Sequence, residues 1–139
     1  MKKTIATILA MWFITTCIFA QKITADKVPA NVKAKLTALY PKVSTVKWEM
    51  EKGNYEAGFS LEKVETSVVI NPAGDLLETE TAIAISALPK GVAEYVAKNY
   101  PGAKIAEASK IVDAKGVVKY EAEVNKKDLL FDSNGKFLK

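Results

Sequence analysis

The apolar residues of this chain follow two kinds of spacing, one typical of a helix and one that alternates as in a strand. A segment with the helical spacing is followed by segments with the alternating spacing, and this order occurs twice. Val32, Leu36 and Leu39 recur at i, i+4 and i+7, a spacing that gives a helix one apolar face. About 60 residues later, Val92 and Val96 repeat this spacing, and Tyr95 and Tyr100 add apolar area. The pattern predicts two short helices.

Prolines mark both ends of each predicted helix. Pro29 and Pro89 suit a first helical turn, because the N–H that proline lacks would have no partner there. Pro41 and Pro101 end the helices, since the residue before a proline avoids helical geometry.

After each helix the apolar spacing falls to two, which is typical of half-buried strands. The predicted strands lie at about 46–50, 55–61, 68–70 and 76–77 after the first helix, and at about 105–112, 118–124 and 129–131 after the second, the register of 105–112 being uncertain. Turn sequences such as Gly53-Asn54 and Asp132-Ser133-Asn134-Gly135 separate them, so antiparallel hairpins are expected.

The same short motifs recur in the same order. They are Val28-Pro29 and Leu88-Pro89, Tyr40-Pro41 and Tyr100-Pro101, Tyr55-Glu56-Ala57 and Tyr120-Glu121-Ala122, and residues 68–77 and 129–138. We interpret them as two diverged copies of one unit, about 24–84 and 85–139, each a helix followed by an antiparallel meander of three or four strands.

Each copy is too small to bury much surface alone. We therefore predict an α+β fold, a single domain over residues 21–139 in which the two copies share a core and form one sheet with the helices packed on one side. The apolar junction 81–87 is expected to be a strand that passes between the copies.

The N-terminal residues have the layout of a secretory signal peptide. Lys2 and Lys3 precede an apolar run over 5–19, and Ala20 supplies a small residue before polar Gln21. The run is shorter than the ~20 residues that span a bilayer. Residues 1–20 are thus predicted to be removed, giving a periplasmic or secreted protein. The alternative is a lipoprotein anchored through Cys17, the one cysteine of the chain.

The motifs at residues 28–139 resemble the PepSY-like proteins, which are also described as similar to beta-lactamase-inhibitor proteins and are common in secretomes of Bacteroidetes-type bacteria. The residues that carry the resemblance are Pro29, Tyr40, Pro41, Trp48, Tyr55, Gly74, Pro89, Tyr100, Pro101, Tyr120 and Gly135. The resemblance implies a tandem α+β fold whose sheet curves around helices, and a role in binding or inhibiting exported proteins. It brings no catalytic residues with it.

The side chains argue against catalysis. The chain has no histidine or arginine, and cleavage after Ala20 would also remove the cysteine, so the commonest general base and thiol chemistry are absent. Ser-x-x-Lys occurs at Ser44, Ser60 and Ser133, outside the helix start and companion motifs that serine catalysis needs. No cofactor or metal is predicted, because the turn at 132–135 lacks the downstream glutamate of a calcium loop.

Charged residues alternate along the chain, and the alternation predicts a solvated surface. Removing Lys2 and Lys3 lowers the formal net charge from +4 to +2, without a basic block for nucleic acid. Three carboxylate pairs, Glu49 with Glu51, Glu78 with Glu80 and Glu121 with Glu123, are expected on a solvated sheet face.

Alternation places four aromatic residues in the core: Trp48, Tyr55, Phe59 and Tyr120. The opposite side of the same strands is the predicted partner surface: Lys47, Glu49, Glu56, Ser60 and Glu62. We therefore expect an exported, non-enzymatic protein-binding module, an inhibitor or modulator of an envelope or secreted protein. The alternative is a structural, envelope-accessory protein without a soluble target.

Overall fold

The structure is a computed structural model that describes residues 21–139. The predicted signal peptide, residues 1–20, and Cys17 within it lie outside the described residues. Among the described residues, none of the helices is both long enough and apolar enough to cross a bilayer.

One antiparallel sheet and two α-helices make up the described chain. The strands are β1 (Gln21–Ile23), β2 (Lys47–Glu51), β3 (Asn54–Leu61), β4 (Val64–Ile70), β5 (Leu76–Ala82), β6 (Ile105–Asp113), β7 (Val118–Val124) and β8 (Lys127–Asp132). The helices are α1 (Ala30–Leu39) and α2 (Lys90–Asn99), with short 3-10 turns η1 (Ala25–Lys27) and η2 (Ile85–Ala87) before them. The strands are neighbours in chain order, from β1 to β8, in one 8-stranded sheet. The predicted α+β class with an antiparallel sheet is confirmed.

Both helices begin and end at the predicted prolines. Pro29 and Pro89 are the N-cap residues, and the backbone N–H groups of Tyr40 and Tyr100 close the last turns on the carbonyls four residues before them, both at 2.8 Å. The inward position predicted for Leu39 is wrong, because its side chain is 41% exposed.

The junction between the halves differs from the expectation. Strand β5 ends at Ala82, and Ile85–Ala87 forms the 3-10 turn η2 instead of continuing as a strand. The apolar residues at 82–85 suggested that the strand continues through the junction, but Ile85 lies in a 3-10 turn and is 46% exposed. Strand β1, which pairs Ile23 with Trp48 at the edge of the sheet, was not predicted.

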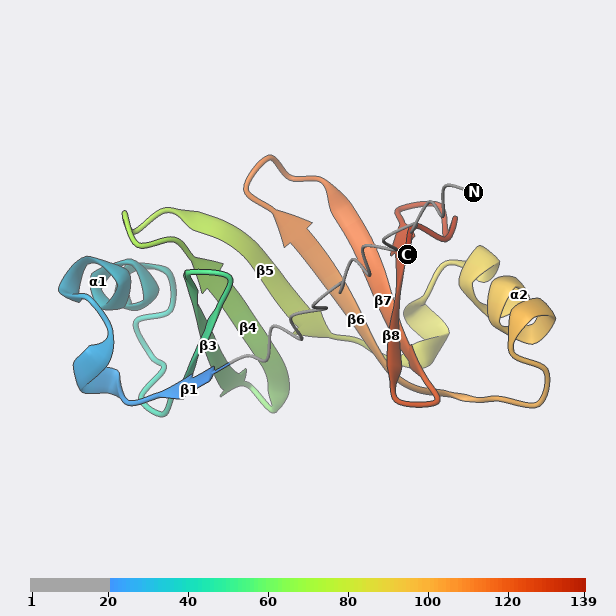
Figure 1. Cartoon of the computed structure of the whole chain (residues 1–139), viewed down its shortest axis with the longest axis horizontal. Coiled ribbons are helices and arrows are strands. Elements are labelled where there is room, and N and C mark those ends of the chain that lie inside the picture. The colour runs from blue at the N-terminus through green and yellow to red at the C-terminus, as the bar shows by residue number, and fades with distance from the viewer. Residues whose placement is uncertain (1–20) are drawn as a thin grey trace, which may run out of the picture.

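Both helices lie over the same face of the sheet. One row of paired residues runs from Ala57 through Val68 and Thr79 to Val112. Ala122, which pairs with the residue four positions before Val112, shares this face because side chains two apart on a strand point the same way. Ala57 and Val68 pack under α1, whereas Ala122 packs under α2. Figure 1 shows the two helices at opposite ends of the molecule with the sheet between them.

The buried residues form two cores and not the single shared core that we expected. The first core comprises Val28, Val32, Leu36, Trp48, Ala57, Phe59, Val68 and Ile70. The second core comprises Val92, Val96, Ala122, Val124, Leu129 and Phe131. The physical reason is that α1 and α2 lie far apart along the sheet, so that each covers only the strands of its own half (Figure 1). The halves are joined by the pairing of β5 with β6.

Candidate functional site

A groove of about 1160 Å³ is lined mainly by residues of the sheet face opposite the helices, together with a few helix-side residues such as Phe59, Thr66 and Ala108. Its floor comes from both halves, because β3, β4 and β5 and then β6 and β7 all contribute residues. The groove-face residues that line it include Lys47, Glu56, Gly58, Ser60, Ser67, Glu80, Ala82, Ser109, Glu121 and Glu123. The loop at Lys42–Thr45 and the start of β8 at Asp128 also line it.

The register of the strands fixes which groove residues are neighbours. Ser67 pairs with Glu80, and Glu80 pairs in turn with Ile111 across the boundary between the halves. In the next row, Ser109 of β6 pairs with Glu121 of β7. Two glutamates, one from each half, therefore flank strand β6 in the middle of the groove.

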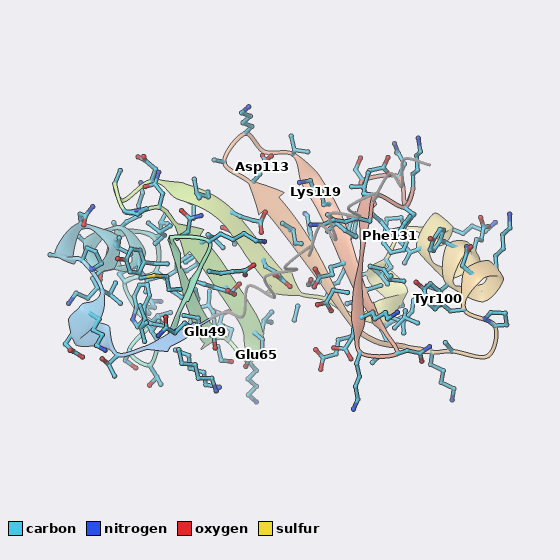
Figure 2. All side chains as sticks on the ribbon, viewed as in Figure 1. Glu49, Glu65, Tyr100, Asp113, Lys119 and Phe131 are labelled. Carbon is cyan, nitrogen blue, oxygen red and sulfur yellow. The ribbon has the colours of Figure 1, made fainter. Side chains whose placement is uncertain are left out.

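Acidic residues are concentrated in the groove far more than elsewhere. Eight of the chain's 16 carboxylates line it, against two of its 20 lysines. Along the sequence the two signs alternate, which predicted a mixed surface. The fold separates them, because the acidic members of the alternation in β3, β5 and β7 all point to the same face. Four residues of this face, Glu49, Glu65, Asp113 and Lys119, are labelled in Figure 2.

Two of these carboxyl groups are partly removed from water. Burial raises the pKa of Glu121 to about 7, and repulsion from Glu80 and Asp128 adds to the increase. Burial also raises the pKa of Glu56; hydrogen bonding to the Ser67 side chain opposes this increase, and repulsion from Glu80 adds to it. Glu121 and Glu123 are both half-buried, so the face predicted to be solvated is only partly exposed to water at this pair. Strand β7 lies between β6 and β8, so side chains of a strand on each side cover part of the Glu121 carboxyl group, which desolvates its charged form.

Ser109 lies on the groove floor beside Glu121. Its side chain is 8% exposed, and its Oγ has no hydrogen-bond partner in the described chain. Buried hydroxyls are nearly always paired, so an unpaired one needs an explanation. No sequence feature singled out this serine.

The predicted partner surface falls on the groove side. Lys47, Glu56, Ser60 and Glu62 line the groove, with Glu62 in the tight turn between β3 and β4 at a φ of 51°. Glu49 pairs with Glu56 on the same face but lies outside the groove lining. Sequence reasoning missed the groove residues of β5 to β7, above all Glu80, Ser109 and Glu121. The alternation of Glu78 with Glu80 and of Glu121 with Glu123 was visible, but only the strand order brings the two pairs together.

The other candidates have structural explanations. Trp48 and Phe59 are buried in the first core, and Tyr55 packs against it, whereas Tyr120 is half-buried outside both cores. Asp132 uses its Oδ1 to accept the backbone N–H groups of Asn134 and Lys136, both at 2.9 Å, so its carboxylate closes a turn. Within residues 21–139, no three acidic side chains gather closely enough to hold a metal ion.

Comparisons with known proteins address the fold and the family. The structure is similar to one from Bacteroides eggerthii named "putative periplasmic proteins", with a TM-score of 0.71 and 19% identity over 81% of this chain and 86% of that chain. A DUF2874 family protein from Bacteroides uniformis gives a TM-score of 0.69 at 22% identity, covering 80% of this chain and 86% of that one. A BLIP-like protein from Bacteroides fragilis gives 0.61 at 22% identity, covering 80% and 83%.

No curated protein matches the chain. The sequence does match the family described as "Putative beta-lactamase-inhibitor-like, PepSY-like", in two overlapping segments at residues 8–78 and 54–139. The two segments together cover almost the whole sequence. The chain therefore belongs to the PepSY-like, beta-lactamase-inhibitor-like family.

Proposed function

We propose that this chain is an exported, non-enzymatic protein-binding module that inhibits or modulates an envelope or secreted protein, and that its groove is the surface that contacts the partner. The observation that carries the proposal is the groove itself, which spans both halves and is lined mainly by residues of the helix-free face. Its polar side chains belong to a sheet, a rigid support for recognition. Two diverged copies of one helix-and-meander unit would explain why both halves contribute strands to it.

Three further points support the proposal. The similar structure from Bacteroides eggerthii is named as periplasmic, and the similar Bacteroides fragilis protein as BLIP-like. The family description is inhibitor-like. The chemistry of the chain favours binding, since neither a histidine nor an arginine is present to act as a base or an anion clamp.

Site-directed cross-linking tests the proposal. Cys17 is the one cysteine of the sequence, so the chain 21–139 contains none and accepts a single new one. Ser60→Cys places a photo-activatable label on an exposed groove residue, and Lys98→Cys places the same label on the exposed side of α2 as the matched control. We expect a discrete cross-linked protein from an envelope extract with Ser60→Cys and not with Lys98→Cys.

The cross-link also distinguishes the alternative, a structural protein of the envelope without a soluble target. That alternative predicts no discrete adduct with soluble protein from either position. Equal labelling of one protein from both positions would show that the groove is not the contact surface, and would contradict the proposal.

A further inference from the structure

We infer that the groove binds a lysine- or arginine-containing segment of a protein partner, whose cationic side chains are received by Glu80 and Glu121 and whose N–H groups reach the buried hydroxyl of Ser109. This inference rests on the proposed function and specifies the chemistry of the partner. It is argued from charge, from an unpaired polar atom, and from the size of the groove.

The negative charge of the groove has no cationic partner within the described residues. The ion pairs of that part of the chain join Lys52 to Glu51 at 2.9 Å and Lys90 to Glu94 at 3.4 Å, and none of these four residues lines the groove. Eight carboxylates facing two lysines leave a strong excess of negative charge in a concave surface. Concave, partly dehydrated surfaces of one sign concentrate ligands of the opposite sign.

The Ser109 hydroxyl supplies a second, independent sign of a ligand. Its Oγ is buried in the groove floor without a hydrogen-bond partner, although it lies in register with Glu121 on the neighbouring strand. A serine hydroxyl can accept one hydrogen bond while it donates another. An ammonium or guanidinium group that displaces the side chains covering this oxygen would give it a donor while also neutralising the adjacent carboxylate.

The arrangement does not suit a metal ion. Calcium requires six to eight oxygens at about 2.3–2.6 Å from one point. Glu80 and Glu121 lie on β5 and β7, which are separated by β6 and hence by about 10 Å across the sheet. No group of three acidic ligands forms anywhere in the described part of the chain. Carboxylates spaced in this way suit several separate cations held on one flexible chain.

The size of the groove favours a protein segment over a small molecule. A volume of about 1160 Å³ exceeds the range of roughly 300–1,000 Å³ that is usual for small-molecule sites. The groove extends from the loop at Lys42 to Asp128 of β8. Long lysine or arginine side chains could reach its floor while the partner's backbone stays near the rim.

The raised pKa of Glu121 is consistent with this ligand. A cation beside the carboxyl group would favour its charged form and lower the pKa from about 7. Binding near pH 7 would thus be accompanied by release of protons, which calorimetry in two buffers of different ionisation enthalpy detects. A peptide without cationic side chains would release no protons on binding.

The test is calorimetric titration of the chain 21–139 with a heptapeptide that alternates glycine and arginine, at low salt. The double variant Glu80→Gln/Glu121→Gln is compared with Asp26→Asn/Glu94→Gln, which removes the same two charges outside the groove. We expect the groove variant to bind the peptide at least about tenfold more weakly and the control to stay within about twofold of the wild type. The glutamine version of the peptide should not bind.

Ser109→Ala provides a variant that leaves the charge unchanged. Because the hydroxyl has no partner in the free protein, the variant should fold normally while it binds the arginine peptide about threefold more weakly. Thermal melts of all variants verify folding. Equal weakening by both double variants would show non-specific attraction and overturn the inference. So would spermine binding as tightly as the peptide, or calcium ions displacing it.

The outcomes separate this inference from the proposed function. If Ser60→Cys still cross-links its partner when Glu80→Gln/Glu121→Gln is added, and the arginine peptide does not bind the wild type, the groove contacts a partner of different chemistry. The inference then fails and the proposed function stands. If Ser60→Cys captures nothing beyond the Lys98→Cys control, the proposed function fails whatever the peptide does.

Discussion

Helices α1 and α2 are closely similar in geometry, whereas the cores beneath them are filled by different side chains. Each has 10 residues after a proline N-cap, and the terminal residues Tyr40 and Tyr100 have φ and ψ of −134° and 69°, and −130° and 64°. Under α1, the ring of Tyr40 packs at 4.8 Å from that of Phe59. Under α2, Phe131 is instead part of a group of three rings.

This difference shows which features of the unit are fixed by backbone geometry and which are free. Both halves have a proline cap before the helix and a turn after β4 or β8, and these features set where each helix starts and how it meets the sheet. The core side chains are interchangeable as long as their total volume fills the space. Corresponding substitutions in the two halves should therefore change the free energy of unfolding by different amounts wherever the contacts of the replaced side chains differ.

The largest expected effect is at the centre of the second core. Phe131 is fully buried, and its ring lies 5.5 Å from that of Tyr95 and 5.7 Å from that of Phe137. Phe131→Ala should lower the free energy of unfolding by about 4 kcal/mol, measured by urea denaturation. Ile70→Ala, at the corresponding position of the first core, should cost about 3 kcal/mol because fewer atoms are removed. A larger loss of stability for Ile70→Ala than for Phe131→Ala would contradict the expectation that the aromatic ring contributes more to its core. Figure 2 shows Phe131 and Tyr100 on the side of the molecule that α2 occupies.

The two helix-terminal tyrosines test how much an aromatic contact at the end of the helix contributes to stability. Both rings are half-buried against their cores, but a ring–ring contact is present only for Tyr40 among these two. Tyr40→Ala should cost about 3 kcal/mol, and Tyr100→Ala about 2 kcal/mol, since an aromatic pair adds roughly 1 kcal/mol. Urea melts of both variants measure the difference. Equal losses would mean that the Phe59 ring contributes nothing specific.

The N-termini of the helices meet the sheet turns in two different ways. Asn31 Nδ2 donates a hydrogen bond to the carbonyl of Pro72 at 2.9 Å. The corresponding residue of α2 is Gly91, and a Cβ there would lie 2.8 Å from the backbone oxygen of Gly135. The second half thus replaces a side-chain contact with a close approach of two backbones.

Substitution by alanine should consequently have unequal effects at these two positions. Gly91→Ala gains about 1 kcal/mol of helix propensity but must displace a backbone turn, so a net loss of about 1–2 kcal/mol is expected. Asn31→Ala loses one exposed hydrogen bond and gains propensity, so its net change should lie within about 0.5 kcal/mol of zero. Thermal unfolding of the two variants checks the order. If Gly91→Ala were more stable than the wild type, the backbone at Gly135 would be able to shift at little energetic cost.

Much of the fold follows from the sequence, because helix and strand periods are local. Pro29, Pro89 and the Gly-containing turns locate the helices and most strands, whereas β1 and the short turn η1 were not predicted and the junction at 81–87 was wrong in part. The groove could not be predicted in the same way. That Glu80 and Glu121 flank one strand depends on the order of strands across the boundary between halves, and the partial burial of Glu121 depends on the strands that lie on either side of it. Neither property is encoded within a single strand.

The smallest expected effect concerns the groove carboxylate with the most displaced pKa. Burial raises the pKa of Glu121 to about 7 from an ordinary value of 4.5, with Glu80, Glu78 and Asp128 adding repulsion and Lys139 opposing it. The folded state therefore holds the proton more tightly than the unfolded state does. The stability that this protonation contributes is complete below pH 4.5 and is lost as the pH rises through 7.

Glu121→Gln removes this loss, because the amide stays neutral at every pH. The variant should match the wild type near pH 4.5 and be more stable by about 1 kcal/mol at pH 8, a value reduced for the remaining contact with solvent. Urea melts across this range provide the measurement. Glu94→Gln, an exposed residue of α2 paired with Lys90, is the control and should lose no more than about 0.5 kcal/mol. If Glu121→Gln were less stable at pH 8, the carboxylate would be well solvated or paired, and the acidic groove would differ little from the mixed surface elsewhere on the molecule.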